Sequence, residues 1–163
     1  MFWKRKPPVE YSDEALLEVS EMFFQDEQES TFGIGQLNVD QLNYSIESLA
    51  EINRYLDIVR ADPKVESAWN QVVLRCGAYV GEVIRRNSAK REYHWLDYQN
   101  AKKVDRKTFE DFGYIISTAA VLYSAPSSFC FPLAKVEKYL TNGPEDDVQF
   151  FAQAVLAQEE GKL

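Results

Sequence analysis

Apolar residues recur at three- and four-residue intervals through the first half of the chain, the spacing that places them on one face of an α-helix. The pattern predicts helices over residues 13–25, 45–60 and 63–87. The third helix is the longest and the most apolar, so we expect it at the centre of the fold. The pair Pro7-Pro8 is incompatible with helix and predicts an extended leader over residues 1–12.

After residue 92 the pattern changes to short β-prone runs that are bounded by turn residues. These runs predict strands over residues 93–98, 114–117, 119–123 and 129–131, followed by helices over 133–141 and 145–158. Helices first, strands together and helices again are typical of an α+β fold. We therefore expect one α+β domain over residues 13–163, with N-terminal helices that include a long central helix, a three- to four-stranded antiparallel sheet and two C-terminal helices.

Two glycines interrupt the long central helix. Gly77 and Gly81 lie four residues apart, and each costs about 1 kcal/mol relative to alanine in a helix interior. Two destabilising glycines on one face of the helix predict that a neighbouring element packs closely against the helix backbone there. This element is either the sheet or the helix over residues 45–60. The alternative is the floor of a groove in which a ligand or partner lies against bare backbone.

The net charge of −8 is concentrated in the first third of the chain. Residues 7–53 hold eleven acids and no Lys or Arg, whereas residues 54–163 hold fifteen charges of each sign. Such a block of like charge projects a field that attracts cationic partners and repels nucleic acid phosphates.

The helix over residues 13–25 displays part of this block on one face, and a basic protein is the partner that this face would attract. The candidate residues are Glu14, Glu18, Glu21, Asp26 and Glu27. The alternative is a solvated helix face that contributes only solubility. A smaller basic cluster over residues 85–107 contains interleaved aromatic residues, but it matches no nucleic-acid-binding motif.

A second candidate site is a pocket between the long helix and the sheet. Its lining residues would be Tyr79, Glu82, Arg86, His94 and Trp95. Glu82 has the spacing to pair with Arg85 or Arg86, and partial burial would make it a candidate acid or base. The only histidine, His94, has no cysteine or second histidine at metal-ligand spacing, so we expect neither a metal nor a cofactor.

The two cysteines, Cys76 and Cys130, form no disulfide framework, and Cys76 falls on an apolar helix face where a thiol is typically core filling. A nucleophilic Cys76–His94 pair is therefore disfavoured. No run of about 18 apolar residues is present that could cross a bilayer, and the charged first residues do not form a secretory signal. We expect a cytoplasmic protein with free thiols that does not bind membranes.

Three short stretches and one tryptophan resemble the pattern of a family of small bacterial domains of unassigned function. They are Gly77-Ala-Tyr-Val-Gly-Glu-Val-Ile-Arg-Arg86, then Trp95, and then Phe131-Pro-Leu-Ala-Lys-Val136 with Leu140-Thr-Asn-Gly143. The resemblance covers about residues 45–155 and leaves the acidic first helix outside. It implies a bacterial, cytoplasmic α+β unit and no established activity.

Two functions remain. The first is a non-catalytic domain that binds a basic partner through its acidic surface, of which an immunity protein against a cationic toxin would be one case. The second is a small enzyme or ligand-binding domain that uses the pocket beside the long helix. A homo-oligomer that associates through exposed aromatic residues such as Phe2 and Trp3 is a further alternative.

Overall fold

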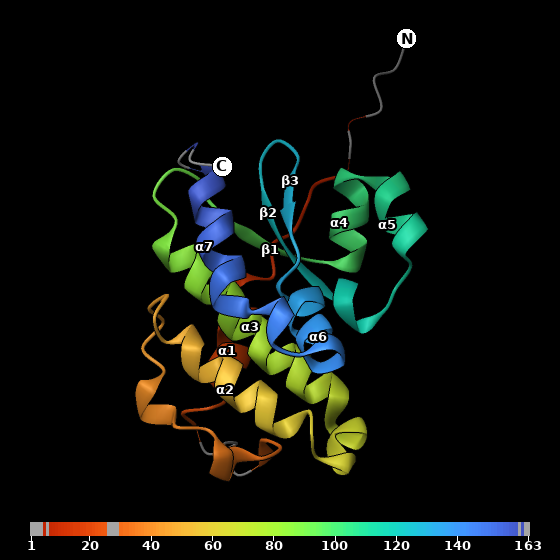
Figure 1. The fold of residues 1–163 in the computed structure, drawn as a ribbon. Helices are drawn as coiled ribbons and strands as arrows, with labels where there is room; N and C mark the ends of the chain where they lie inside the picture. Colours follow the sequence, from red (N-terminus) through yellow and green to blue (C-terminus); the bar gives the residue numbers. More distant parts are fainter. Residues whose placement is uncertain (1–4, 6, 26–29, 160, 162–163) are drawn as a thin grey trace.

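The structure is a computed structural model that describes residues 5, 7–25, 30–159 and 161. It has the predicted α+β architecture (Figure 1). The helices are α1 (Asp13–Glu21), α2 (Leu49–Val59), α3 (Trp69–Asn87), α4 (Tyr98–Val104), α5 (Arg106–Phe112), α6 (Pro132–Asn142) and α7 (Val148–Glu159). The strands are β1 (His94–Asp97), β2 (Ala120–Ser124) and β3 (Ser128–Cys130). Short 3-10 helices span Ile34–Gln36, Val39–Gln41, Pro63–Ala68, Ile116–Thr118 and Pro144–Asp146.

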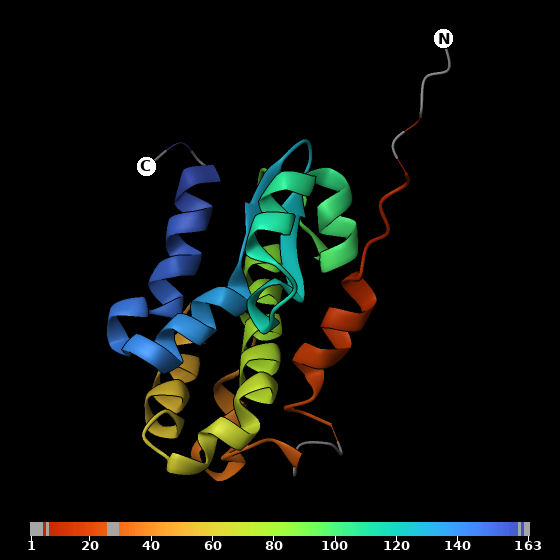
Figure 2. The ribbon, with the colours of Figure 1, turned by 90° about the vertical axis from the view of Figure 1, so that its right-hand side faces the viewer.

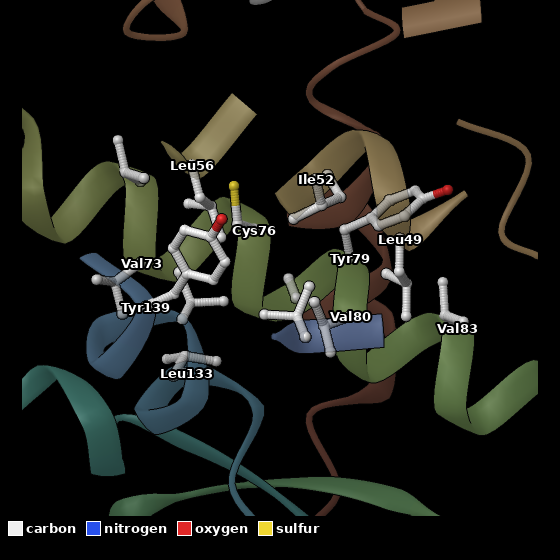
Figure 3. Packing of buried hydrophobic residues seen from close by; sticks show 14 of the residues in the cluster. Leu49, Ile52, Leu56, Val73, Cys76, Tyr79, Val80, Val83, Leu133 and Tyr139 are labelled. Atoms are coloured by element: carbon white, nitrogen blue, oxygen red, sulfur yellow. The ribbon is translucent and has the colours of Figure 1, made fainter. Parts of the chain in front are cut away.

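Helix α3 is the central element, as predicted. Every residue from Cys76 to Ile84 is buried, and α3 packs against α1, α6 and α7. In Figure 3, apolar side chains of α2 and α6 point toward α3 from different sides. They include Leu49, Ile52 and Leu56 of α2 and Leu133 and Tyr139 of α6, which meet Val73, Cys76 and Val80 of α3.

The sheet is antiparallel with the strand order β1-β2-β3. One face carries Trp95 and Leu122, which are paired across β1 and β2 and belong to the main core around α3. The other face carries Leu96 and Val121, which form a smaller core with Phe109 of α5. Helices α4 and α5 therefore cover the face of the sheet that α3 does not (Figure 2).

The two glycines of α3 allow close packing. A Cβ atom at Gly81 would overlap the indole ring of Trp95, and one at Gly77 would lie 2.9 Å from Leu133 Cα. The close approach inferred from the sequence is therefore confirmed. Its neighbours are the sheet at Gly81 and α6 at Gly77, and not the α2 helix that was the other expectation.

The prediction of a strand over residues 114–117 is wrong. Tyr114 and Ile115 are 73% and 51% exposed, and the chain then forms a 3-10 turn. Thr118 explains the turn, because its Oγ1 accepts a hydrogen bond from Ile115 N at 3.1 Å and lies 2.7 Å from Gly113 O. A local side chain thus satisfies backbone groups that a strand would have paired across a sheet.

Helices α4 and α5 were not expected, although each has a capping aspartate. The side chain of Asp97 accepts from Asn100 N, and that of Asp105 accepts from Thr108 N. The ends of other helices also differ from the prediction: α1 ends at Glu21 and not at Gln25, and α2 begins at Leu49 after turns over residues 45–48. Residues 7–12 of the leader are in neither helix nor strand.

None of the helices among the described residues combines the length and the apolar composition that crossing a bilayer requires. Phe2 and Trp3, considered above for homo-oligomer contacts, lie outside the described residues.

Replacing Gly81 with alanine is expected to lower the free energy of unfolding by about 1–3 kcal/mol, because the added methyl group overlaps the Trp95 ring. Gly35 is the matched control, since a Cβ there meets nothing within 4 Å. Gly35→Ala is expected to change stability by less than about 0.5 kcal/mol. Urea unfolding followed by circular dichroism checks both values, and equal stability of the two variants would contradict the packing argument.

Candidate functional site

Asp13, the first residue of α1, ties this helix to α3 and β1. Its Oδ2 lies 2.7 Å from His94 Nδ1 and 3.1 Å from Arg85 Nη2. Its Oδ1 accepts a hydrogen bond of 2.6 Å from Trp95 N, and Ser12 N donates to Trp95 O at 2.8 Å. The start of α1 is therefore held against β1 by charged and backbone hydrogen bonds.

Beneath this contact lies a buried carboxylate. Glu82 is only 2% exposed, and its oxygens accept from Arg85 Nη1 at 2.8 and 3.1 Å and from Trp95 Nε1 at 3.2 Å. Burial of an unpaired charge costs several kcal/mol, so Arg85 is required to compensate for Glu82. Because Arg85 also contacts Asp13, one guanidinium serves two carboxylates from different helices.

His94 lies between two carboxylates and under an aromatic ring. Its Nε2 is 3.1 Å from Glu92 Oε1, on the opposite side of the ring from Asp13. The ring of Tyr11 stacks on the imidazole with centroids 3.9 Å apart and an angle of 3° between the planes. Tyr11 is nevertheless 51% exposed, so this stack presents an aromatic surface to solvent.

Two surface hollows meet at Tyr11. The first has a volume of about 380 Å³ and lies along α1, where Tyr11, Ser12, Glu14, Ala15 and Glu18 line it. The second has a volume of about 420 Å³ and lies between the loop before β1 and the tip of the β2–β3 hairpin. Its lining residues are Tyr11, Lys90, Arg91, Glu92, His94, Ser124, Ala125, Pro126 and Ser128.

The acidic residues chosen from the sequence differ in position. Glu14 and Glu18 are exposed, and neither forms an ion pair with a Lys or Arg among the described residues. Glu21 is partly buried and accepts a hydrogen bond from Gln25 Nε2 at 3.4 Å. Asp26 and Glu27 lie outside the described residues.

The five predicted pocket residues fall into two groups. Glu82, His94 and Trp95 belong to the Asp13 network described above. Tyr79 and Arg86 belong instead to a stack around Tyr44, whose ring lies 4.8 Å from that of Tyr79 and 3.5 Å from Arg86 Cζ.

The polar atoms of the buried members already have protein partners. Tyr79 Oη lies 2.7 Å from Ser48 Oγ and accepts from Tyr44 N, and burial raises the pKa of this tyrosine. At Gly81 the indole of Trp95 fills the space beside α3, so the bare backbone forms no groove floor there. Among the five residues, His94 alone lines a hollow described above.

The cysteines have unreactive surroundings. Burial raises the pKa of Cys76 well above its ordinary value and raises the pKa of Cys130 to about 12. A thiol with a raised pKa is a poor nucleophile near neutral pH. The ring nitrogens of His94 contact Asp13 and Glu92 and not Cys76. Within the described ranges, no three His, Cys, Asp or Glu side chains are placed so that they could hold a metal ion together.

The wall of the second hollow is held by a carboxylate from α7. Glu159 Oε1 accepts from the backbone N–H groups of Lys90 and Arg91, the latter at 2.8 Å, and Oε2 accepts from Ser88 Oγ at 2.7 Å. Burial opposes ionisation of Glu159, but the hydrogen bonds from Ser88, Lys90 and Arg91 outweigh it, and the pKa is lowered. The loop over residues 88–92 is thereby fixed to the end of α7.

Sequence reasoning did not select Tyr11, Asp13 or Glu159 as site residues. The position of Asp13 at the start of a helix indicated only a possible cap. Its partner His94 is 81 residues away in the sequence, and no local pattern indicates such a pair.

Comparison of the chain with family models, with curated proteins and with solved structures found no match. The resemblance to small bacterial domains of unassigned function stays a prediction. The structure itself defines an α+β domain. On one surface it places the acidic helix α1, the exposed Tyr11 and His94, whose ring is held by Tyr11 and two carboxylates.

Replacing Arg85 with methionine is expected to lower the free energy of unfolding by about 3–5 kcal/mol, because Glu82 stays buried without its counter-charge. The double variant Arg85→Met/Glu82→Gln is expected to recover much of this loss, since it removes both charges. Chemical denaturation of the three proteins at neutral pH checks this. If the double variant is no more stable than the single one, the Glu82–Arg85 pair does not carry the effect.

The lowered pKa of Glu159 predicts a pH dependence. The carboxyl group of Glu159 has a pKa of 4.5 in the unfolded chain and a lower pKa in the folded protein. The ionised carboxylate therefore contributes fully to folding stability above pH 4.5, and this contribution is lost as the pH falls below 4.5 and through the folded pKa. The stability difference between the wild type and Glu159→Gln is therefore expected to shrink between pH 7 and pH 3. Ser88→Ala, which removes one donor to the carboxylate, is expected to weaken this pH dependence. A difference that grows on acidification would contradict the assignment.

Proposed function

We propose that this chain is a non-catalytic protein-binding domain that engages a basic partner through the acidic face of α1. We define this face by Tyr11, Glu14 and Glu18. The observation that carries the proposal is that Glu14 and Glu18 are exposed, form no ion pair within the described residues and line a hollow together with a half-exposed tyrosine.

The distribution of charge supports the proposal. The segment over residues 7–53 has no Lys or Arg that could neutralise these acids locally. Arg85 reaches α1 from the basic segment of the chain, but it contacts Asp13 at the start of the helix. Glu14 and Glu18 thus stay available to cations of another molecule, and their field would accelerate its approach.

The position of Tyr11 also supports the proposal, because this residue is suited to contact a partner protein. Tyrosine is frequent among the residues that dominate binding energy, because a large rigid ring is buried at little cost in conformational entropy. The stack on His94 fixes one face of the Tyr11 ring, and Asp13 in turn contacts His94. The binding surface is therefore ordered before the partner arrives, which lowers the entropic cost of association.

This function agrees with the expected cytoplasmic location and with an inhibitor of the immunity type, which would cover the cationic surface of a toxin. In such a mechanism the acidic face steers the partner, and Tyr11 is buried at the contact. The domain would act by occlusion, and no bond would be made or broken.

A ligand-binding role for the second hollow is the alternative function. The observation that favours it is the combination of Lys90, Arg91 and His94 with the hydroxyl groups of Ser124 and Ser128 around about 420 Å³ of open space. The cations Lys90 and Arg91 and the hydroxyl groups, which outnumber the single carboxylate of Glu92, would suit a small anionic ligand.

The acidic face is tested by reversing its charge. Glu14→Lys/Glu18→Lys is expected to abolish capture of basic proteins from a lysate of the source organism, because it turns attraction into repulsion. Proteins held by the immobilised wild type and released by added salt are identified by mass spectrometry. With a purified partner, the double reversal is expected to lower the association rate constant about tenfold or more.

Glu66→Lys/Asp111→Lys is the matched control, since it makes the same change in net charge at exposed acids outside the acidic face. This variant is expected to retain the captured proteins. Tyr11→Ala is expected to raise the dissociation rate constant and to leave the association rate constant nearly unchanged. The proposal fails if both double variants lose the same proteins, or if the captured proteins are not basic.

A further inference from the structure

A second surface of the domain has the opposite character. Beside β3 lies a hollow of about 340 Å³ that is bounded by α6 and α7. Its lining residues are Phe129, Cys130, Phe131, Ala134, Lys135, Lys138, Phe151, Ala154, Val155 and Gln158. A neighbouring hollow of about 200 Å³ shares four of these residues and continues to Arg91 and Glu159. We call the two hollows together the β3–α7 groove.

The groove opens on the edge of the sheet. Successive side chains of a strand point to opposite faces, yet the consecutive residues Phe129 and Cys130 both line the groove. In both views of the ribbon, α7 runs beside the β2–β3 hairpin (Figures 1 and 2). The strand order makes β3 an outer strand that pairs with β2 alone.

An outer strand directs alternate N–H and C=O groups away from its sheet, where they are able to pair with another chain. Within the described chain, no backbone hydrogen bond joins β3 to α7. The strand Ser128–Cys130 offers about 10 Å of edge, which is room for three or four residues of an added strand.

The walls of the larger hollow are mainly apolar, and its charged lining residues are lysines. Three phenylalanine residues line it, Phe129, Phe131 and Phe151. The rings of Phe129 and Phe131 also lie 5.1 and 6.1 Å from the ring of Phe109. Lys135 and Lys138 lie one turn apart on α6, and no carboxylate of the described residues lines the larger hollow. Lys135 donates to Asp146 Oδ1 at 2.9 Å, whereas Lys138 forms no ion pair of that length among the described residues.

The charged side chains of the smaller hollow already have hydrogen-bond partners. The guanidinium of Arg91 donates to the Oγ of Ser128, and the carboxylate of Glu159 accepts hydrogen bonds from the loop over residues 88–91. Among the described residues, Lys138 has no ion pair, and its charge acts on Asp146 only at a longer distance. A carboxylate is therefore the complementary group at the α6 end of the groove.

We propose that the β3–α7 groove binds an extended segment of a partner protein, which adds a strand to β3. Apolar side chains of this segment contact Phe129, Phe131 and Phe151, and an acidic side chain pairs with Lys138. Strand addition takes its affinity from backbone hydrogen bonds and its specificity from pockets for alternate side chains. This inference does not depend on the acidic face of α1.

The probe is a fluorescein-labelled pentapeptide, Asp-Val-Phe-Val-Glu, and its binding to the full-length protein is followed by fluorescence anisotropy. A basic peptide of the same core, Lys-Val-Phe-Val-Lys, is the comparison. The acidic peptide is expected to bind about tenfold or more tightly than the basic one, because Lys138 and Lys135 repel the latter. Equal affinity of the two peptides, or no binding of the acidic one, would overturn the proposal.

Two variants locate the binding site. Lys138→Glu is expected to weaken the acidic peptide about tenfold, whereas Lys64→Glu, the same change at an exposed lysine of another segment, is expected to have no effect. Ala154→Trp is expected to fill the groove and to block the peptide, with circular dichroism as the check that it folds. Loss of binding in Lys64→Glu as well as in Lys138→Glu would show that only net charge matters and would overturn the proposal.

Backbone methylation of the peptide distinguishes strand addition from other modes. In an added strand only alternate N–H groups donate to β3. Methylation of one alternate set is therefore expected to abolish binding, and methylation of the other set is expected to be tolerated. Equal sensitivity of both sets would argue against an added strand.

The Glu14→Lys/Glu18→Lys variant is expected to bind the peptide normally. Failure of the groove proposal is therefore distinguishable from failure of the proposal for the acidic face of α1.

Discussion

The contact between the bare backbone of α3 at Gly81 and the indole of Trp95 is the packing constraint from which the polar network follows. It brings β1 so close to α3 that Trp95 Nε1 reaches the buried carboxylate of Glu82. Glu82 requires the charge of Arg85, and Arg85 extends to Asp13 at the start of α1. The orientation of the acidic helix is therefore set by interactions that begin at a glycine inside α3.

The domain has two surfaces of different chemistry. The acidic face of α1 combines carboxylates with the ring of Tyr11, whereas the β3–α7 groove combines phenylalanine residues with lysines of α6. Under the two proposals, these surfaces contact two partners of opposite charge. Neither surface contains a reactive thiol, since both cysteines have raised pKa values.

Local patterns predicted the elements whose cause is local. Helical spacing of apolar residues located α2, α3 and α6, and the two glycines of α3 correctly indicated close neighbours. The β-prone run over residues 114–117 was misleading, because Thr118 bonds to Ile115 and Gly113 and closes a turn there. Helices α4 and α5 are short and depend on the caps Asp97 and Asp105, and their charged sequences lack a strong apolar period.

The exposed acids of α1 were also foreseeable, because a run of 47 residues without Lys or Arg leaves its carboxylates without nearby partners. The contacts of the surrounding residues were not foreseeable from the sequence. Asp13 meets His94 across 81 positions, and Glu159 meets Arg91 across 68. Such pairs form only after helices have packed at a particular distance and rotation. Periodicity along the chain specifies which face of a helix is buried, but the contacts between distant faces are decided by how side chains fill the core.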